Sequence, residues 1–357
     1  MKILIDIGHP AHVHLFRNFA KDMLEKGNSV LFTTRDKEMA IYLLKVYNFE
    51  YHSFGKPYKG IISKIIGLFL FNYRLFKVAR KFKADIFLSH GSIYAAQVSS
   101  LLGKKHISFE DTGNMEQIHL YKPFTKVILV SNSFKKTFSR QIVYNGYHEL
   151  AYLHPNQFKP NRDILKTYGL DQDEKLILLR FVSWNATHDL NHKGLTLVRK
   201  IEIAQTFTKY GRVLISSENE LPEELLPFKI KIKPEDIFHV MAHCSLVFGE
   251  SGTMASEAAV LGVSAIYIDS TSRDYTQEQE KKYGLVFNFA EDDEEIGKAI
   301  KKSISILENN TNQFKLGREK LLKEKIDVSA FLSWFIDNYP QSVQIMKENP
   351  SYQYKFI

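Results

Sequence analysis

The fold is decided by one stretch of the sequence, Val247-Phe248-Gly249-Glu250-Ser251-Gly252-Thr253-Met254-Ala255-Ser256-Glu257-Ala258-Ala259. The apolar run at 245–248 indicates a strand, and the small residues after it follow a helical pattern that ends at Gly262. Residues 263–268 then predict a second buried strand. A strand, a small-residue turn, a helix and a further strand form the unit from which open parallel sheets are built.

The turn in this stretch combines two glycines with the hydroxyl residues Ser251 and Thr253. Backbone N–H groups in such a turn, together with the positive end of the helix dipole, favour an anion such as a diphosphate. Glu257 follows within the helix, where a carboxylate would reach the hydroxyls of a sugar or ribose. A purely structural interpretation, in which the glycines allow tight packing and Glu257 is solvated, fits this stretch alone equally well.

Composition places the chain among globular proteins of two domains, with 357 residues, 44% of them hydrophobic and 25% charged. The net charge of +8 allows an anionic partner, but no arginine-rich run or nucleic-acid motif is present, so nucleic acid is not expected. The single cysteine, Cys244, excludes an internal disulfide and fits a reducing cytoplasm. Residues 2–7 already form a strand pattern, so no signal peptide is expected.

Strands and helices alternate along the chain, which predicts two blocks of parallel sheet. Polar residues and two prolines at 154–160 separate the blocks. The expected domains are 1–158, 159–326, and a C-terminal helix and tail at 327–357 that is able to pack back on the first domain. Loops are expected at 8–14 and 269–279, and a small strand near Ile230 and Ile232. The expected strands are 2–7, 29–33, 49–54, 85–89, 105–109, 126–130, 176–180, 213–216, 245–248, 263–268 and 286–289.

The segment 61–83 is a long helical pattern that runs from Ile61 and other apolar residues to a basic end at Lys83. Its apolar part is short and is interrupted by Lys64, so it is not expected to span a bilayer. Most of it is expected to pack on the sheet. The alternative is contact with a membrane surface, with the basic residues facing anionic head groups.

Polar clusters follow three of the expected strands in the first block. They are Gly8-His9-Pro10-Ala11-His12-Val13-His14, His90-Gly91-Ser92 and Glu110-Asp111-Thr112-Gly113-Asn114. The carboxyl ends of parallel strands lie at one edge of a sheet, where ligands bind. The three clusters are therefore expected to lie close together.

These strings resemble the GT-B glycosyltransferase superfamily, and within it a domain family of unknown function with a GT-B-like fold. The marks of the resemblance are the histidine string at 8–14, Ser89-His90-Gly91-Ser92, and Gly249-Glu250-Ser251-Gly252-Thr253-Met254. It extends nearly to residue 325. Among characterised enzymes the chain is similar to the peptidoglycan N-acetylglucosaminyltransferase that builds lipid II and, more distantly, to the UDP-N-acetylglucosamine 2-epimerases.

The resemblance implies an α/β protein of GT-B fold, with two Rossmann-like domains facing across a cleft. The C-terminal domain would bind a nucleotide-diphosphate sugar, most simply a UDP-sugar, without a metal or cofactor. The diphosphate would lie at Ser251, Gly252 and Thr253, and Glu257 would bind the ribose. Further contacts are expected from Arg180 and Ser183 to phosphate, and from Arg273, Gln277 and Gln279 to the donor sugar.

The first domain would then bind the acceptor and supply a base. His12 lies where many GT-B enzymes carry a histidine that deprotonates the acceptor hydroxyl, and its near-neutral pKa suits that role. Asp111, or Glu110, would orient the imidazole. His9 and His14 compete for the same role, and His90 would lie in the acceptor cleft. Pro10 and Ala11 replace the glycines that usually precede this histidine.

The protein is therefore predicted to be a metal-independent glycosyltransferase of polysaccharide biosynthesis. It is expected in the cytoplasm, and a location at the inner face of the membrane is compatible with the sequence. Its acceptor would be a glycan or a lipid-linked precursor. One alternative is a UDP-sugar 2-epimerase, because Glu110 and Arg273 match positions in those enzymes. His90-Gly91-Ser92 replaces their Gly-Asp-Thr string, however, and removes a carboxylate. A non-catalytic nucleotide-sugar-binding protein is a second alternative.

Overall fold

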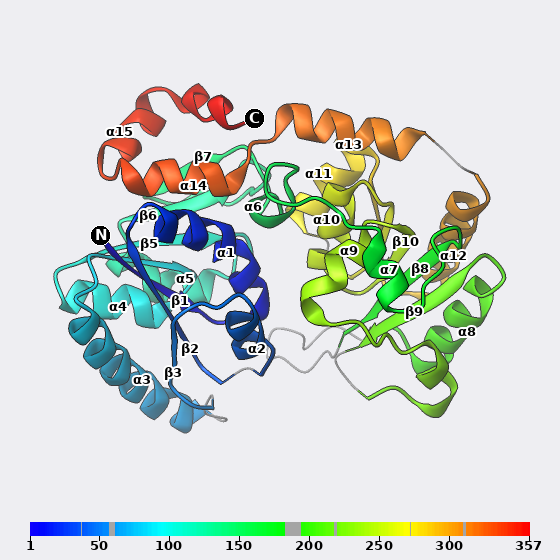
Figure 1. Cartoon of the computed structure of the whole chain (residues 1–357), viewed down its shortest axis with the longest axis horizontal. Coiled ribbons are helices and arrows are strands. Elements are labelled where there is room, and N and C mark those ends of the chain that lie inside the picture. Colours follow the sequence, from blue (N-terminus) through cyan, green and yellow to red (C-terminus); the bar gives the residue numbers. More distant parts are fainter. Residues whose placement is uncertain (37, 57–60, 183–193, 218–219, 272, 310–311) are drawn as a thin grey trace. The chain divides into compact units, whose positions relative to one another are not determined.

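The computed structural model of the chain describes all residues except 37, 57–60, 183–193, 218–219, 272 and 310–311 (Figure 1). The chain divides into two compact units. The first comprises Met1–Gln157 together with Lys325–Ile357, and the second comprises Phe158–Glu324. The C-terminal segment thus returns to the first unit, where Ile326 donates a backbone hydrogen bond to Asn145.

The first unit is built on a parallel sheet in the order β3-β2-β1-β4-β5-β6-β7. Most strand positions are buried, which explains why the sequence shows near-continuous apolar runs there. Strand order reverses between β1 and β4, and ligands bind at such a switch point, beyond the carboxyl ends of the strands. The strands are β1 (Lys2–Ile7), β2 (Ser29–Thr34), β3 (Tyr51–Ser53), β4 (Ile86–His90), β5 (Lys105–Glu110), β6 (Val127–Ser131) and β7 (Gln141–Tyr144).

Helices cover this sheet. Phe71 and Leu75 of α3 pack with Phe87 of β4 and Ala95 of α4 in one apolar cluster, while α1 contacts α2, α6 and α14. The helices of this unit are α1 (Pro10–Glu25), α2 (Glu38–Val46), α3 (Ile61–Phe82), α4 (Ile93–Leu101), α5 (Met115–Tyr121), η1 (Lys122–Phe124), α6 (Leu150–Leu153), α14 (Val328–Asp337), α15 (Gln341–Glu348) and η4 (Pro350–Phe356).

The second unit has a parallel sheet in the order β12-β11-β10-β8-β9, with its switch point between β8 and β10. Its strands are β8 (Leu176–Phe181), β9 (Arg212–Ser217), β10 (Cys244–Gly249), β11 (Ala265–Ile268) and β12 (Val286–Phe289). Its helices are α7 (Asp163–Thr167), α8 (Leu197–Phe207), η2 (Glu223–Phe228), η3 (Pro234–Asp236), α9 (Ile237–Met241), α10 (Gly252–Leu261), α11 (Asp274–Tyr283), α12 (Asp293–Glu308) and α13 (Gln313–Glu324).

The stretch from β10 to α10 folds as predicted for local reasons. Gly249 passes so close to β8 that a Cβ atom there would lie 2.0 Å from the Arg180 carbonyl oxygen. The Ser251 hydroxyl accepts a hydrogen bond from the Met254 N–H at 3.3 Å and so caps the start of α10. Gly262 ends the helix with a φ of 86°, in the left-handed region.

The structure corrects several expected elements. Residues 8–14 are not all loop, because Pro10 begins α1 and His9 is its N-cap, whose Nδ1 accepts from the Ala11 N–H at 3.2 Å. Most of the expected loop at 269–279 is helix α11, whose few apolar residues concealed its periodicity. At 230–232 there is no strand; Lys229 instead forms an isolated bridge to Ile215.

No helix of the described residues is long and apolar enough to cross a membrane.

Candidate active site

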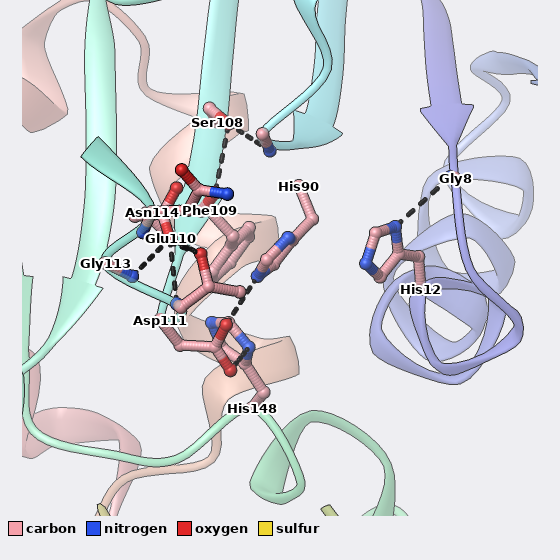
Figure 2. A network of polar contacts seen from close by, with 12 residues as sticks. Gly8, His12, His90, Ser108, Phe109, Glu110, Asp111, Gly113, Asn114 and His148 are labelled. Atoms are coloured by element: carbon pink, nitrogen blue, oxygen red, sulfur yellow. Dashed lines mark hydrogen bonds and ion pairs between the residues drawn. The ribbon is translucent and has the colours of Figure 1, made fainter. Parts of the chain in front are cut away.

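Four side chains meet beside the switch point of the first sheet. His90 ends β4, Asp111 follows β5, His148 follows β7, and His12 lies in the first turn of α1. His90 Nε2 lies 2.9 Å from Asp111 Oδ1, and His148 Nδ1 lies 3.0 Å from Asp111 Oδ2. The rings of His12 and His90 have centroids 4.5 Å apart. Figure 2 shows His90 between Asp111 and His12.

The structure separates the three histidines of the string at 8–14. His9 caps α1. His14 is buried near Arg17 Nη1, at 3.3 Å, and its ring lies 5.5 Å from that of Tyr152. His12 is the member of the string whose ring lies beside that of His90. His14 lies on another face of α1, because residues two apart on a helix do not face each other.

A backbone group determines which nitrogen of His12 carries the proton. The Gly8 N–H donates to His12 Nδ1 at 3.3 Å, so the neutral ring carries its proton on Nε2. Burial, with the neighbouring His90 and His9, lowers the His12 pKa well below its usual value. His12 is therefore neutral near pH 7 and presents a donor at Nε2 rather than a free lone pair. The acid expected behind His12 lies behind His90 and His148 instead.

Asp111 and its two imidazoles form a charge-linked group. Burial opposes ionisation of Asp111, but His148 and His90 hold its pKa well below the usual value. Burial also opposes protonation of His90, yet the contact with Asp111 raises the His90 pKa above 6.5. The His148 side chain is nine-tenths buried, and its Nε2 has no hydrogen-bond partner among the described residues. Asp111 thus remains an anion that stabilises a positive charge on His90.

His148 was not predicted from the sequence. It follows β7, a short strand with one exposed position that lacks an apolar run. β7 ends at the same edge of the sheet as β4 and β5. A search for polar residues after every parallel strand, short strands included, could therefore have found His148.

Glu110 has a structural role. Its Oε1 accepts hydrogen bonds from the Thr112 N–H and hydroxyl and from the Gly113 N–H, and its Oε2 accepts from the Tyr121 hydroxyl at 2.6 Å. The residue is almost completely buried. These four bonds fix the turn that presents Asp111, and they occupy the carboxylate that the sequence offered as an orienting acid.

A second buried network, centred on β1, was also not predicted from the sequence. Asp6 in β1 accepts hydrogen bonds from the Thr33 hydroxyl, Arg35 Nη1 and the Ser92 hydroxyl. Arg35 Nη2 also donates to the Ile7 carbonyl at 3.0 Å. The network ties β1, β2 and the start of α4 together and sets the backbone that leads to His12.

The group of His90, Asp111 and His148 has donors suited to a metal ion. Its ligand atoms all lie within 4.8 Å of one another, and nitrogen with carboxylate oxygen suits zinc or a similar divalent cation. The two imidazoles already contact different oxygens of Asp111. Each oxygen of Asp111 is therefore already paired with one imidazole nitrogen.

The second constellation surrounds the start of α10. A Cβ atom at Gly252 would lie 3.0 Å from the Tyr275 hydroxyl and 3.1 Å from the Tyr267 hydroxyl. Tyr267 donates to Asp269 and also bonds Arg273, which precedes α11. The first turn of α10 is thus lined by hydroxyls and a guanidinium, which suits an anion.

The structure describes three further residues that were predicted to bind the nucleotide sugar, and they lie in β8 and α10. Arg180 lies at the end of β8 and donates to the Ser216 hydroxyl at 3.0 Å, next to the switch point. Thr253 is half-buried in the first turn of α10, and Glu257 is buried in the same helix. Ser183 lies outside the described residues.

The two glutamines predicted for the donor sugar differ in position. Gln279 is fully buried and donates to the Ser256 hydroxyl at 2.7 Å, so it links α11 to α10 and is not available to a sugar. Gln277 is half-buried in the first turn of α11. In place of the expected donor-contacting loop, the structure has the half-buried first turn of helix α11.

The sequence suggests no role for Glu250, but the structure shows that its carboxylate has a structural role. It is buried and accepts from the Leu195 N–H at 2.6 Å and the Val182 N–H at 3.2 Å, with Lys200 Nζ at 3.6 Å. Its charge is therefore compensated by these donors. It holds the backbone at Val182 and at Leu195.

The two parallel sheets and their helices define an α/β protein of GT-B fold. The model of one family, DUF354, described as a protein of unknown function, matches residues 1–319. The chain belongs to this family. Curated proteins gave no significant match by sequence.

Solved structures of nucleotide-sugar enzymes resemble the chain over nearly its whole length. UDP-GlcNAc 2-epimerase from Neisseria meningitidis, bound to UDP-GlcNAc, has a TM-score of 0.66 at 13% identity, covering 95% of this chain and 100% of that chain. MurG from Acinetobacter baumannii has a TM-score of 0.59 at 13% identity, with coverages of 94% and 99%. The spinosyn rhamnosyltransferase SpnG, complexed with spinosyn aglycone, has a TM-score of 0.60 at 12% identity, with coverages of 95% and 100%. At these identities the likeness shows the fold.

Proposed function

We propose that the protein is a metal-independent glycosyltransferase that moves a sugar from a nucleotide diphosphate to a glycan or lipid-linked acceptor. The observation that carries this proposal is the His90–Asp111 pair, an imidazole backed by a carboxylate at the switch point of the first sheet. A carboxylate in this position raises the basicity of an imidazole and holds its ring in place. Transfer to a hydroxyl needs one such base.

The second unit would bind the donor. The N–H groups at Ser251, Gly252 and Thr253 would meet the diphosphate, and Arg180 and Arg273 would add charge-assisted hydrogen bonds. Glu257 would accept from the ribose, and Gln277 would contact the sugar. The resemblance to enzymes named for UDP-sugars favours UDP as the nucleotide. The helix dipole and the arginines would stabilise the leaving diphosphate, which is the role a metal has in other transferases.

The proton would be handled by the first unit. The acceptor hydroxyl would give its proton to His90, its oxygen would form the bond to the anomeric carbon, and the bond from that carbon to the diphosphate would break. Asp111 would stabilise the imidazolium, and His148 would hold Asp111. His12 would donate a hydrogen bond from Nε2 to the acceptor, because its tautomer offers a donor.

The epimerase alternative is less well supported by the positions of the carboxylates. Elimination and re-addition of a nucleotide require acids and bases around the sugar ring. The four hydrogen bonds of Glu110 occupy the carboxylate that matches the epimerases. Asp111 is committed to two imidazoles. The carboxylates of Glu110 and Asp111 are thus already engaged, and the imidazoles of His90 and His148 remain. The epimerase reaction needs several acids and bases.

Incubation of the protein with UDP-, GDP- and dTDP-sugars, with and without glycan and lipid-linked acceptors, tests the proposal. We expect acceptor-dependent release of the nucleotide diphosphate, measured by chromatography. Interconversion of the sugar without an acceptor would establish the epimerase instead. Tight nucleotide-sugar binding with neither product would establish a binding protein.

A further inference from the structure

Helix α3 has two apolar faces, and the protein covers one of them. Phe71, Leu75 and Ala79 are buried against the sheet. Ile66, Phe69, Leu70 and Tyr73 are exposed, with Phe69 at 70% and Tyr73 at 57% of full exposure. These four positions follow the spacing of one helix face. The outer face of α3 is therefore an apolar stripe that no described part of the chain covers.

The charge of the protein is concentrated around this stripe. Residues 51–84 contain eight lysines and arginines and no aspartate or glutamate. Eight is also the net charge of the whole chain, so all other residues together are balanced. Arg74, Lys77, Arg80 and Lys81 of α3 are exposed. Apolar side chains at the beginning of one helix are thus followed by an acid-free basic region.

We propose that α3 binds the surface of an anionic lipid bilayer. We define the α3 surface as Ile66, Phe69, Leu70, Tyr73, Arg74, Lys77, Arg80 and Lys81. Its apolar side chains would enter the boundary between head groups and acyl chains, and its cations would contact lipid phosphates. Lysine and arginine can do this while their stems remain in the apolar layer. The helix would lie along the surface.

Charge also argues against the main competing occupant, a second copy of this chain. Two copies that met through α3 would bring two acid-free basic regions together without an anion between them, and this is unfavourable. A bilayer that contains anionic lipids supplies both an apolar layer and the opposite charge. The proposal does not depend on the enzymatic reaction, since none of these residues belongs to the candidate active site.

Sedimentation of the full chain with lipid vesicles tests the proposal. We expect binding to vesicles of phosphatidylcholine mixed with phosphatidylglycerol and little binding to phosphatidylcholine alone. The double variant Lys77→Gln/Arg80→Gln should bind about 30-fold more weakly, since each basic residue near the surface contributes about fivefold. Phe69→Ser should bind about tenfold more weakly.

Leu197→Ser/Val198→Ser is the matched control, because both residues are exposed and apolar but lie on α8. It should bind vesicles as the unaltered protein does, and all variants should unfold at the same temperature. In Phe69→Trp the added indole should shift its emission to the blue on binding. Equal loss in the α8 control, or no binding by the unaltered protein, would overturn the proposal. So would a dimer in solution that Phe69→Ser dissociates.

Discussion

The Gly8 N–H donates a hydrogen bond to His12 Nδ1, and this contact decides what the His12 imidazole offers to a substrate. With Nδ1 occupied as an acceptor, the neutral ring has its proton on Nε2. The pKa of His12 is lowered, first by burial and then by its histidine neighbours, so the ring stays neutral under ordinary conditions. A histidine in this state acts as a donor.

His12→Ala should therefore reduce kcat by about a hundredfold or more, the effect of removing one donor aimed at a transition state. Nucleotide affinity should change little, because the proposed donor site belongs to the second unit. His12→Gln should retain much more activity than His12→Ala, since an amide nitrogen can replace the Nε2 donor. If both variants are equally inactive in steady-state kinetics, His12 is the base and the tautomer assignment is wrong.

Asp111 should set the pH dependence of the reaction. The base must be neutral to accept a proton, and the raised pKa of His90 places the acid limb of the kcat/KM profile above pH 6.5. Asp111→Asn removes the charge that raises this pKa, so the limb should move to lower pH while the plateau rate falls. Asp173→Asn, at a side chain with 97% exposure, should leave the profile unchanged. A limb that does not move in Asp111→Asn would exclude His90 as the base.

Metal removal should leave the reaction intact. His90 needs a free nitrogen to act as the base, and a cation held by His90, Asp111 and His148 would compete with the proton. Protein dialysed against EDTA should retain its full rate, and added zinc should inhibit it. His148→Ala should weaken that inhibition. A rate that EDTA abolishes and zinc restores would show that the three residues form a catalytic metal centre.

The sequence predicted the strands well because buried parallel strands are continuous apolar runs, as in β1 and β8. It failed where the pattern is polar or short. The start of α1 carries histidines, α11 has few apolar residues, and β7 has four residues with one exposed. The pairing of Asp111 with His90 and His148 depends on the lateral order of β4, β5, β6 and β7, which no local pattern encodes.

Gly252→Ala should weaken nucleotide binding. The added Cβ atom would lie about 3 Å from the hydroxyls of Tyr267 and Tyr275, which are at the ends of rigid rings. One of the two, Tyr267, is further held by Asp269. The first turn of α10 must therefore shift, and we expect an affinity for UDP lower by about tenfold or more in calorimetry.

Gly297→Ala is the matched control, because a Cβ atom there meets no other atom within 4 Å. It lies in α12, where alanine favours the helix, so stability should be equal or slightly higher and UDP affinity unchanged. Unchanged affinity in Gly252→Ala as well would separate this turn from the diphosphate.

His106 should make the first unit sensitive to acid. It is fully buried between β4 and β6, with Nε2 at 2.9 Å from the Ser89 hydroxyl and Nδ1 at 2.8 Å from the Thr125 hydroxyl. Thr125 gives its own proton to the Tyr121 carbonyl, so Thr125 accepts from Nδ1–H and Ser89 donates to Nε2. The ring is thus held neutral, and burial lowers its pKa to about 3.

The sign of the effect follows from the two pKa values. An unfolded histidine titrates near pH 6.5 and the folded one at about 3, so between these values the unfolded state binds the additional proton. The free energy of unfolding should therefore fall as the pH drops through this window, by at most about 1.4 kcal/mol per pH unit from this residue.

Urea unfolding followed by circular dichroism at several pH values measures the slope of the unfolding free energy against pH. His106→Gln should have a smaller slope, whereas His119→Gln, at an exposed histidine, should keep the original one. Equal slopes in His106→Gln and the unaltered protein would mean that His106 is protonated in the folded state or reached by water there.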